Sequence, residues 1–73
     1  MQHLLKILDH RGHTELSWDP DAVDEMETVR ERFETLMRQN FVAFDLTSSP
    51  GEMIREFRPQ ATEILVTPEF VGG

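Results

Sequence analysis

The chain has 73 residues, of which 14 are acidic and 7 basic, so its formal net charge is −7. This length has room for one hydrophobic core, and the negative charge opposes binding to nucleic acid and to anionic membrane surfaces. Cysteine is absent, which excludes disulfides, thiolate metal sites and a cysteine nucleophile. No apolar run is long enough to span a membrane and no signal peptide is recognisable, so we expect a cytoplasmic protein.

A β-hairpin is predicted at the start of the chain. Its strands are residues 4–8 and 14–18, joined by Asp9-His10-Arg11-Gly12-His13, in which Gly12 is suited to a positive φ. The first strand carries apolar residues on both faces, which is typical of a strand near the middle of a sheet. Alternation in the second strand predicts an inward face formed by Thr14, Leu16 and Trp18.

One amphipathic helix is predicted from Pro20 to about Gln39. Asp19 is a suitable N-cap, and Pro20 fits the first helical position. Asn40 is suited to the left-handed conformation that ends many helices. The buried stripe is predicted to contain Ala22, Met26, Val29, Phe33, Leu36 and Met37. On the charged face, Glu34 and Arg38 stand in the order that favours an ion pair.

Three more strands are predicted after the helix. The first covers residues 41–47, and its buried side is expected to hold Val42, Phe44 and Leu46. A turn over residues 48–51 leads to a short strand from Met53 to Phe57 with both of these end residues on one face. A second turn then precedes the last strand, residues 62–67.

The order ββαβββ predicts an α+β domain of the β-grasp type, with one helix packed across a mixed sheet of four to five strands. In this topology the last strand lies centrally and parallel to the first, in agreement with the continuous apolar runs of residues 4–8 and 64–66. Periodicity does not fix the strand order. The alternative is a meander of the last three strands against the helix, with the N-terminal hairpin beside it.

The chain divides into a single domain, residues 1–67, and a predicted flexible tail, residues 68–73. The tail ends in Gly72 and Gly73, and we expect this pair to be the native C-terminus. Two residues without Cβ can lie in a narrow channel, so a partner enzyme could close around the backbone and reach the terminal carboxylate. Phe70 lies beyond Pro68, where the sheet is expected to end, and is a candidate anchor for a partner's pocket.

The run Val66-Thr67-Pro68-Glu69-Phe70-Val71-Gly72-Gly73 resembles the end of the ubiquitin-like β-grasp proteins that are activated at a C-terminal Gly-Gly. It looks especially like the small sulfur carriers of molybdopterin and thiamine biosynthesis. The resemblance implies that the chain binds no cofactor and that a partner of the ubiquitin-activating type uses ATP and Mg²⁺ to adenylate Gly73. Docking would then involve Pro68, Phe70 and Val71.

The same resemblance leaves two outcomes open after activation. As a modifier, the chain would be transferred through Gly73 to an acceptor protein or another acceptor. As a sulfur carrier, it would receive sulfur from a transfer partner and end as a Gly73 thiocarboxylate. An interaction module or small enzyme subunit without C-terminal chemistry is the alternative class, in which the exposed edge of a strand or the helix binds a partner and the diglycine has no role.

No catalytic or metal site is predicted. The sequence has no phosphate-binding glycine loop and no nucleophile with a plausible base, so we expect a protein that is not an enzyme. His10 and His13 have HxxH spacing, and His3 could lie near them across the hairpin. Without a supporting carboxylate or thiolate pattern, solvated turn histidines are the preferred interpretation.

Overall fold

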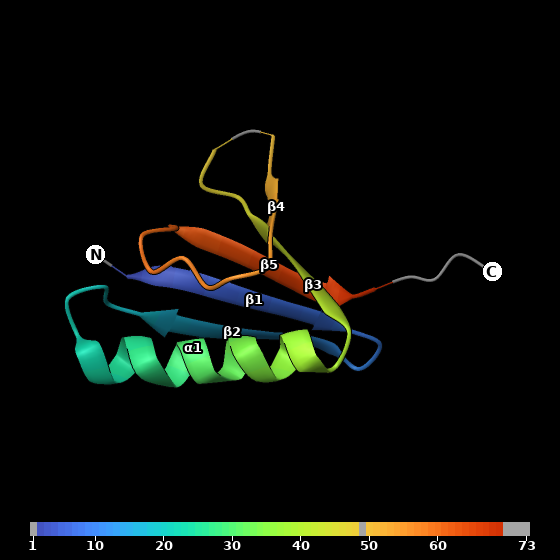
Figure 1. Cartoon of the computed structure of the whole chain (residues 1–73), viewed down its shortest axis with the longest axis horizontal. Helices are drawn as coiled ribbons and strands as arrows, with labels where there is room; N and C mark the ends of the chain where they lie inside the picture. Colours follow the sequence, from blue (N-terminus) through green and yellow to red (C-terminus); the bar gives the residue numbers. More distant parts are fainter. Residues whose placement is uncertain (1, 49, 70–73) are drawn as a thin grey trace.

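The computed structural model describes residues 2–48 and 50–69. Within them the chain forms a small α+β domain in which one helix lies across a five-stranded mixed sheet (Figure 1). The elements in chain order are β1 (His3–Asp9), β2 (Gly12–Trp18), α1 (Val23–Arg38), β3 (Phe41–Asp45), β4 (Glu52–Ile54) and β5 (Glu63–Pro68).

The last strand lies at the centre of the sheet. The spatial order is β2-β1-β5-β3-β4, with β5 parallel to β1 and antiparallel to β3 (Figure 1). The expected central, parallel position of this strand is confirmed, and the alternative meander of the last three strands is wrong. Ile64 and Val66 are fully buried in β5, and a central position provides the cover that such a strand requires.

The predicted N-terminal hairpin is confirmed. β1 and β2 pair without a break from His3 opposite Trp18 to Asp9 opposite Gly12. Gly12 has φ of +126°, a conformation that a side chain would strain. The Asp9 carboxylate accepts a hydrogen bond from the Arg11 backbone N–H at 2.8 Å, so the turn is fixed by its own side chain as well as by its glycine.

Trp18 is fully buried in the core, as its position on the strand predicts. Its indole N–H donates to the Pro59 carbonyl at 3.1 Å, and its ring lies 5.3 Å from that of His3 and 5.1 Å from that of Phe57. Phe33 of α1 completes the aromatic group from the helix side, 5.8 Å from Phe57. The remaining buried apolar residues are Leu5, Ile7, Val29, Leu36, Ala43, Ile54, Ala61, Ile64 and Val66.

The helix begins later than predicted. α1 starts at Val23, because Asp19 closes a turn instead of capping the helix. The Asp19 carboxylate accepts from the Asp21 N–H, and its carbonyl accepts from the Ala22 N–H. A short acidic side chain can accept hydrogen bonds from nearby backbone N–H groups in a turn, which competes with helix formation. The prediction that Asp19 is the N-cap was therefore wrong. At the other end Asn40 has φ of 65°, which confirms the predicted left-handed terminator.

The face of β3 that meets the helix is opposite to the one predicted. Ala43 is fully buried, whereas Val42 and Phe44 are half-buried on the other face. Cross-strand partners share a face, and Ala43 lies opposite both Val66 and Ile54 of the core. The small side chain of Ala43 therefore occupies the position under the helix. The strand ends at Asp45, so Leu46 falls outside it.

β4 is also shorter than predicted, because it ends at Ile54 and does not reach Phe57. Ile54 is buried, whereas Met53 is 56% exposed, because Ile54 is the residue that pairs with Ala43. Phe57 does not continue the strand. The chain leaves the sheet after Ile54, and this bend carries the Phe57 ring back onto Trp18 and Phe33.

Candidate functional site

The base of the C-terminal tail is built by the end of β5. Pro68, which the sequence analysis placed in the tail, is the last residue of this strand and lies opposite Phe41. The Glu69 N–H donates to the Asn40 carbonyl at 3.0 Å. Backbone N–H groups of successive residues in a strand point to opposite sides, so the Pro68 nitrogen points away from β3. The register with β1 ends at Val66, and no backbone donor is needed at Pro68.

The turn of the hairpin lies beside this strand end. A shallow apolar hollow is lined by Leu8, Asp9 and His10 together with Thr67 and Pro68. Parallel strands finish at the same edge of a sheet, so the parallel pairing of β1 with β5 brings these segments together. The sequence analysis did not identify Leu8 or His10 as neighbours of the tail. The expected parallel pairing was the signal from which their position follows.

The structure describes only part of the predicted C-terminal docking and activation site. Phe70, Val71, Gly72 and Gly73 lie outside the described residues, so Pro68 is the member of the predicted set whose surroundings are known. Gly73 is four residues beyond Glu69 in the sequence.

The three histidines do not converge. His3 lies opposite Trp18 at one end of the hairpin, whereas His13 lies opposite Leu8 near the other. The His3 ring is buried and its Nδ1–H donates to the Ala61 carbonyl at 2.7 Å, so it forms part of the core. Among the described residues no group of three His, Cys, Asp or Glu side chains could hold a metal ion.

Lys6, the sole lysine of the chain, lies on the sheet face opposite α1. Its ammonium is 3.3 Å from a carboxylate oxygen of Glu63 on the neighbouring strand β5, and both side chains are about one-third exposed. The face that carries this pair is called the open face below.

A second charged group fastens the segment that follows β4. Arg58 forms ion pairs with Asp45 of β3 and Glu52 of β4, and the hydrogen bond with Glu52 is the main cause of its raised pKa. Hydrogen bonding from Thr47 holds the pKa of Asp45 below its ordinary value, and Arg58 adds to this effect. These ion pairs hold the loop after β4 against the sheet.

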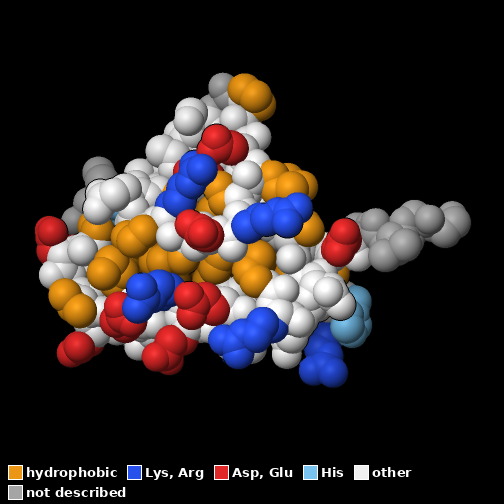
Figure 2. All heavy atoms as spheres, viewed as in Figure 1, with side chains coloured by type: hydrophobic (Ala, Val, Ile, Leu, Met, Phe, Trp, Pro, Cys, Tyr) orange, Lys and Arg blue, Asp and Glu red, His pale blue; other side chains and the backbone are white. Residues whose placement is uncertain are grey.

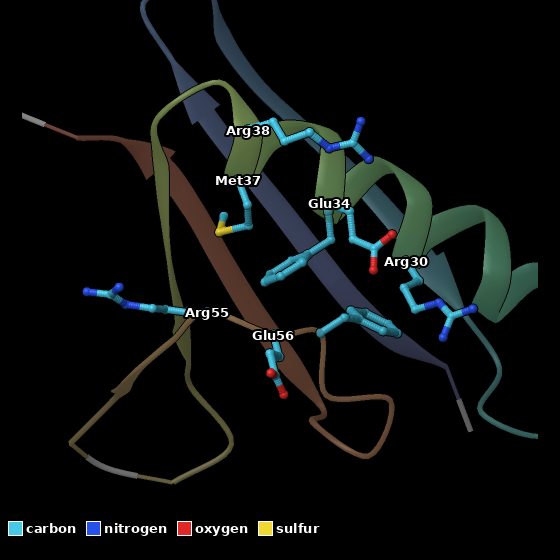
Figure 3. A pocket seen from close by; sticks show the side chains of 8 residues that line it. Arg30, Glu34, Met37, Arg38, Arg55 and Glu56 are labelled. Carbon is cyan, nitrogen blue, oxygen red and sulfur yellow. The ribbon is translucent and has the colours of Figure 1, made fainter.

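A groove separates α1 from the segment that follows β4 (Figure 3). Its apolar part consists of Met37 on the helix and Phe57 on the opposite wall, and the fully buried ring of Phe33 lies behind them. Its charged rim is formed by Arg30, Glu34, Arg38, Arg55 and Glu56. The groove has a volume of about 490 Å³ and is open to solvent.

Comparison of the chain with family models, curated proteins and solved structures finds no match. The functional argument is therefore based on the fold and on the residues described above. In the part of the chain that the structure describes, no helix combines the length and the apolar character needed to cross a membrane.

Proposed function

We propose that the chain is a ubiquitin-like β-grasp carrier whose Gly73 carboxylate is adenylated by an ATP-dependent activating enzyme and then transferred to an acceptor. The observation that carries the proposal is the position of β5. This strand is central, parallel to β1, and ends at Pro68, so the central strand of the sheet leads directly into the segment that ends in Gly72 and Gly73.

The position of β5 matters because an activating enzyme has to reach the C-terminal residues while the strand before them stays fixed in the sheet. β5 pairs with β1 on one side and β3 on the other, and the Glu69 N–H still bonds to Asn40 after the strand has ended. An enzyme that pulls on the terminal residues therefore acts against a strand anchored in the core. Gly72 and Gly73 add no side chain that would block a narrow channel around the backbone.

The chemistry requires no catalytic group from this chain. A Gly73 carboxylate oxygen attacks the α-phosphorus of ATP, which releases pyrophosphate and leaves an acyl adenylate. An acceptor nucleophile then attacks the carbonyl carbon and displaces AMP. An amine, hydroxyl or thiol acceptor gives a conjugate, whereas sulfide gives a thiocarboxylate. Modifier and sulfur carrier thus share the first step and differ in the second.

Intact mass spectrometry tests the proposal. The purified chain is incubated with ATP, Mg²⁺ and clarified extract of the organism that encodes it, and the same reaction without ATP is the control. We expect an ATP-dependent adenylate, thiocarboxylate or conjugate at Gly73. A chain that lacks Gly72 and Gly73 should fold normally by circular dichroism, since these residues contribute no apolar burial, and should not react. An unchanged mass, or reaction of the shortened chain, would exclude C-terminal activation.

A further inference from the structure

The sheet has two edge strands, and they differ in how well they are protected from pairing with another strand. β4 contains only three residues, and the chain bends away after Ile54, so it offers little edge. β2 contains seven residues, and its register with β1 is unbroken. It has no proline, lysine or bulge, the features that commonly protect edge strands. Among the described residues, no strand pairs with the outer edge of β2.

Backbone alternation shows which groups of β2 face outward. The Leu4 N–H donates to the Thr62 carbonyl on the β5 side of β1, so the residues next to Leu4 direct their N–H and C=O groups toward β2. One of these residues, Leu5, lies opposite Leu16 in the register. The backbone groups of Leu16 therefore face β1, and those of the alternate residues of β2 face away from the sheet. These outward residues are His13, Glu15 and Ser17, and all three are exposed.

A second copy of the chain offers the same edge. Under a two-fold axis perpendicular to the sheet, two β2 strands run antiparallel, and each satisfies outward backbone groups of the other. The net charge of −7 opposes self-association in general, so the contact must bring complementary groups together. Two features of the chain do so, namely the order of residues in β2 and the distribution of charge along α1.

The order of residues in β2 favours one register. With Thr14 opposite its own copy, His13 lies opposite Glu15 of the second copy, and the two-fold axis repeats this contact. Within one chain the His13 Nε2 and a Glu15 carboxylate oxygen are 3.9 Å apart, too far for a hydrogen bond, so both groups are available. A register centred on Glu15 would instead place two carboxylates opposite each other, which destabilises a strand pair.

The charge along α1 suits the same antiparallel contact. The helix begins near the end of β2 and runs back toward the hairpin turn (Figure 1). Residues 19–27 contain five acidic and no basic side chains, whereas residues 28–38 contain three arginines and two glutamates. Figure 2 shows that acidic side chains predominate at the end where α1 begins and basic ones toward the other end. In the two-fold arrangement, the acidic end of one helix lies toward the basic end of the other.

We propose that two copies of the chain pair through the outer edges of β2, in the register centred on Thr14. The two five-stranded sheets become one continuous sheet with two antiparallel helices on the same face. The outward N–H and C=O groups of His13 pair with those of Glu15 in the second copy, and the imidazole donates to the Glu15 carboxylate. This interface uses neither Gly72 nor Gly73 and goes beyond the proposed C-terminal chemistry.

Sedimentation equilibrium of the full chain, up to about 1 mM so that weak dimers are covered, tests the proposal. We expect the average mass to rise toward twice the monomer mass. Glu15→His replaces both complementary pairs with pairs of imidazoles and should weaken dimerisation about tenfold. Adding His13→Glu restores the pairs in the reversed order and should recover the affinity. Glu56→His, at an exposed position beyond β4, makes the same charge change and should dimerise like wild type.

Hydrogen exchange locates the contact, and circular dichroism melts establish that each variant folds. The amide groups of His13 and Glu15 should exchange more slowly as the protein concentration rises. The chain that lacks Gly72 and Gly73 should dimerise equally well, so failure of this proposal and failure of C-terminal activation are distinguishable. A monomer at every concentration, a tighter dimer for Glu15→His, an equal loss for Glu56→His, or protection that appears only when clarified extract is added would each overturn the proposal.

Discussion

The two faces of the sheet use alternate residues of the same strands and yet differ sharply in burial. Under α1, the side chains of Leu5, Ile64 and Val66 are completely buried. On the open face, Leu4 and Leu65 are half-buried and Leu8 is 40% exposed. Both sets are apolar, so hydrophobicity alone does not distinguish the faces. The difference comes from the single helix, which can cover only one side of the sheet.

The contrast between the two faces has a consequence for stability. The covered face supplies most of the apolar burial, which is the dominant favourable contribution to folding. The open face keeps apolar and charged side chains side by side, with the Lys6–Glu63 pair among leucines of β1 and β5. Substitutions on the covered face should therefore affect folding strongly, whereas those on the open face should affect it weakly.

The largest effect is expected from Phe33→Ala. The Phe33 ring is fully buried against Phe57, and its removal leaves a cavity in the core. We expect a loss of about 3–5 kcal/mol in the free energy of unfolding, close to the whole stability of a domain this small. Thermal denaturation followed by circular dichroism should show no cooperative transition.

Phe44→Ala is the matched variant on the open face. The same ring is removed from a half-buried position, so the expected loss is only about 1–1.5 kcal/mol and the transition should stay cooperative. Equal losses for Phe33→Ala and Phe44→Ala would show that the two faces contribute alike, and the contrast between them would be wrong.

An intermediate effect is expected for Asp45, which lies at the end of β3 with its side chain only 13% exposed. Because the folded state holds the pKa of this carboxyl below its ordinary value of 3.8, its contribution to stability is present above that value. The contribution is lost as the pH falls through the lower folded pKa. Asp45→Asn should cost about 1–2 kcal/mol at neutral pH.

Urea denaturation at a series of pH values measures this effect. The difference in stability between wild type and Asp45→Asn should shrink as the pH falls below 3.8. Thr47→Val, which keeps the Thr47 backbone N–H bonded to the carboxylate, is a partial control. A difference that stays constant down to the lowest pH would mean that ionisation of Asp45 does not contribute to folding.

The smallest effect is expected from Lys6→Met on the open face. The ion pair with Glu63 is about one-third exposed, and pairs of this kind contribute little because water screens them. The change in unfolding free energy should stay within about 0.5 kcal/mol, and Glu63→Gln should give a similar value. A loss above about 1.5 kcal/mol for either variant would indicate that the open face is covered in solution.

Part of the candidate site could be predicted from the sequence. The parallel pairing of the first and last strands was expected from their apolar runs, and it places the hairpin turn beside Pro68. The groove could not be predicted. It depends on the bend after Ile54, which brings Phe57 and Arg55 opposite α1, and no local pattern in the sequence specifies such a contact.

The sequence by itself determined the features that depend on local conformation. Gly12 provides the positive φ of the hairpin turn, Asn40 ends the helix, and the alternation of β2 directs Trp18 inward. Each of these follows from the sterics of a few adjacent residues. The small α+β class with one helix and a mixed sheet follows in the same way from the succession of such segments.

Only the tertiary structure decided which face of β3 and β4 meets the helix and where α1 begins. Val42 and Phe44 are larger and more apolar than Ala43, yet Ala43 is the residue buried under the helix. Periodicity shows that side chains alternate, but when both faces are apolar it cannot show which one is covered. Pairing of Ala43 with Val66 and Ile54 decides this, because neighbouring strands must present their core residues to the same side.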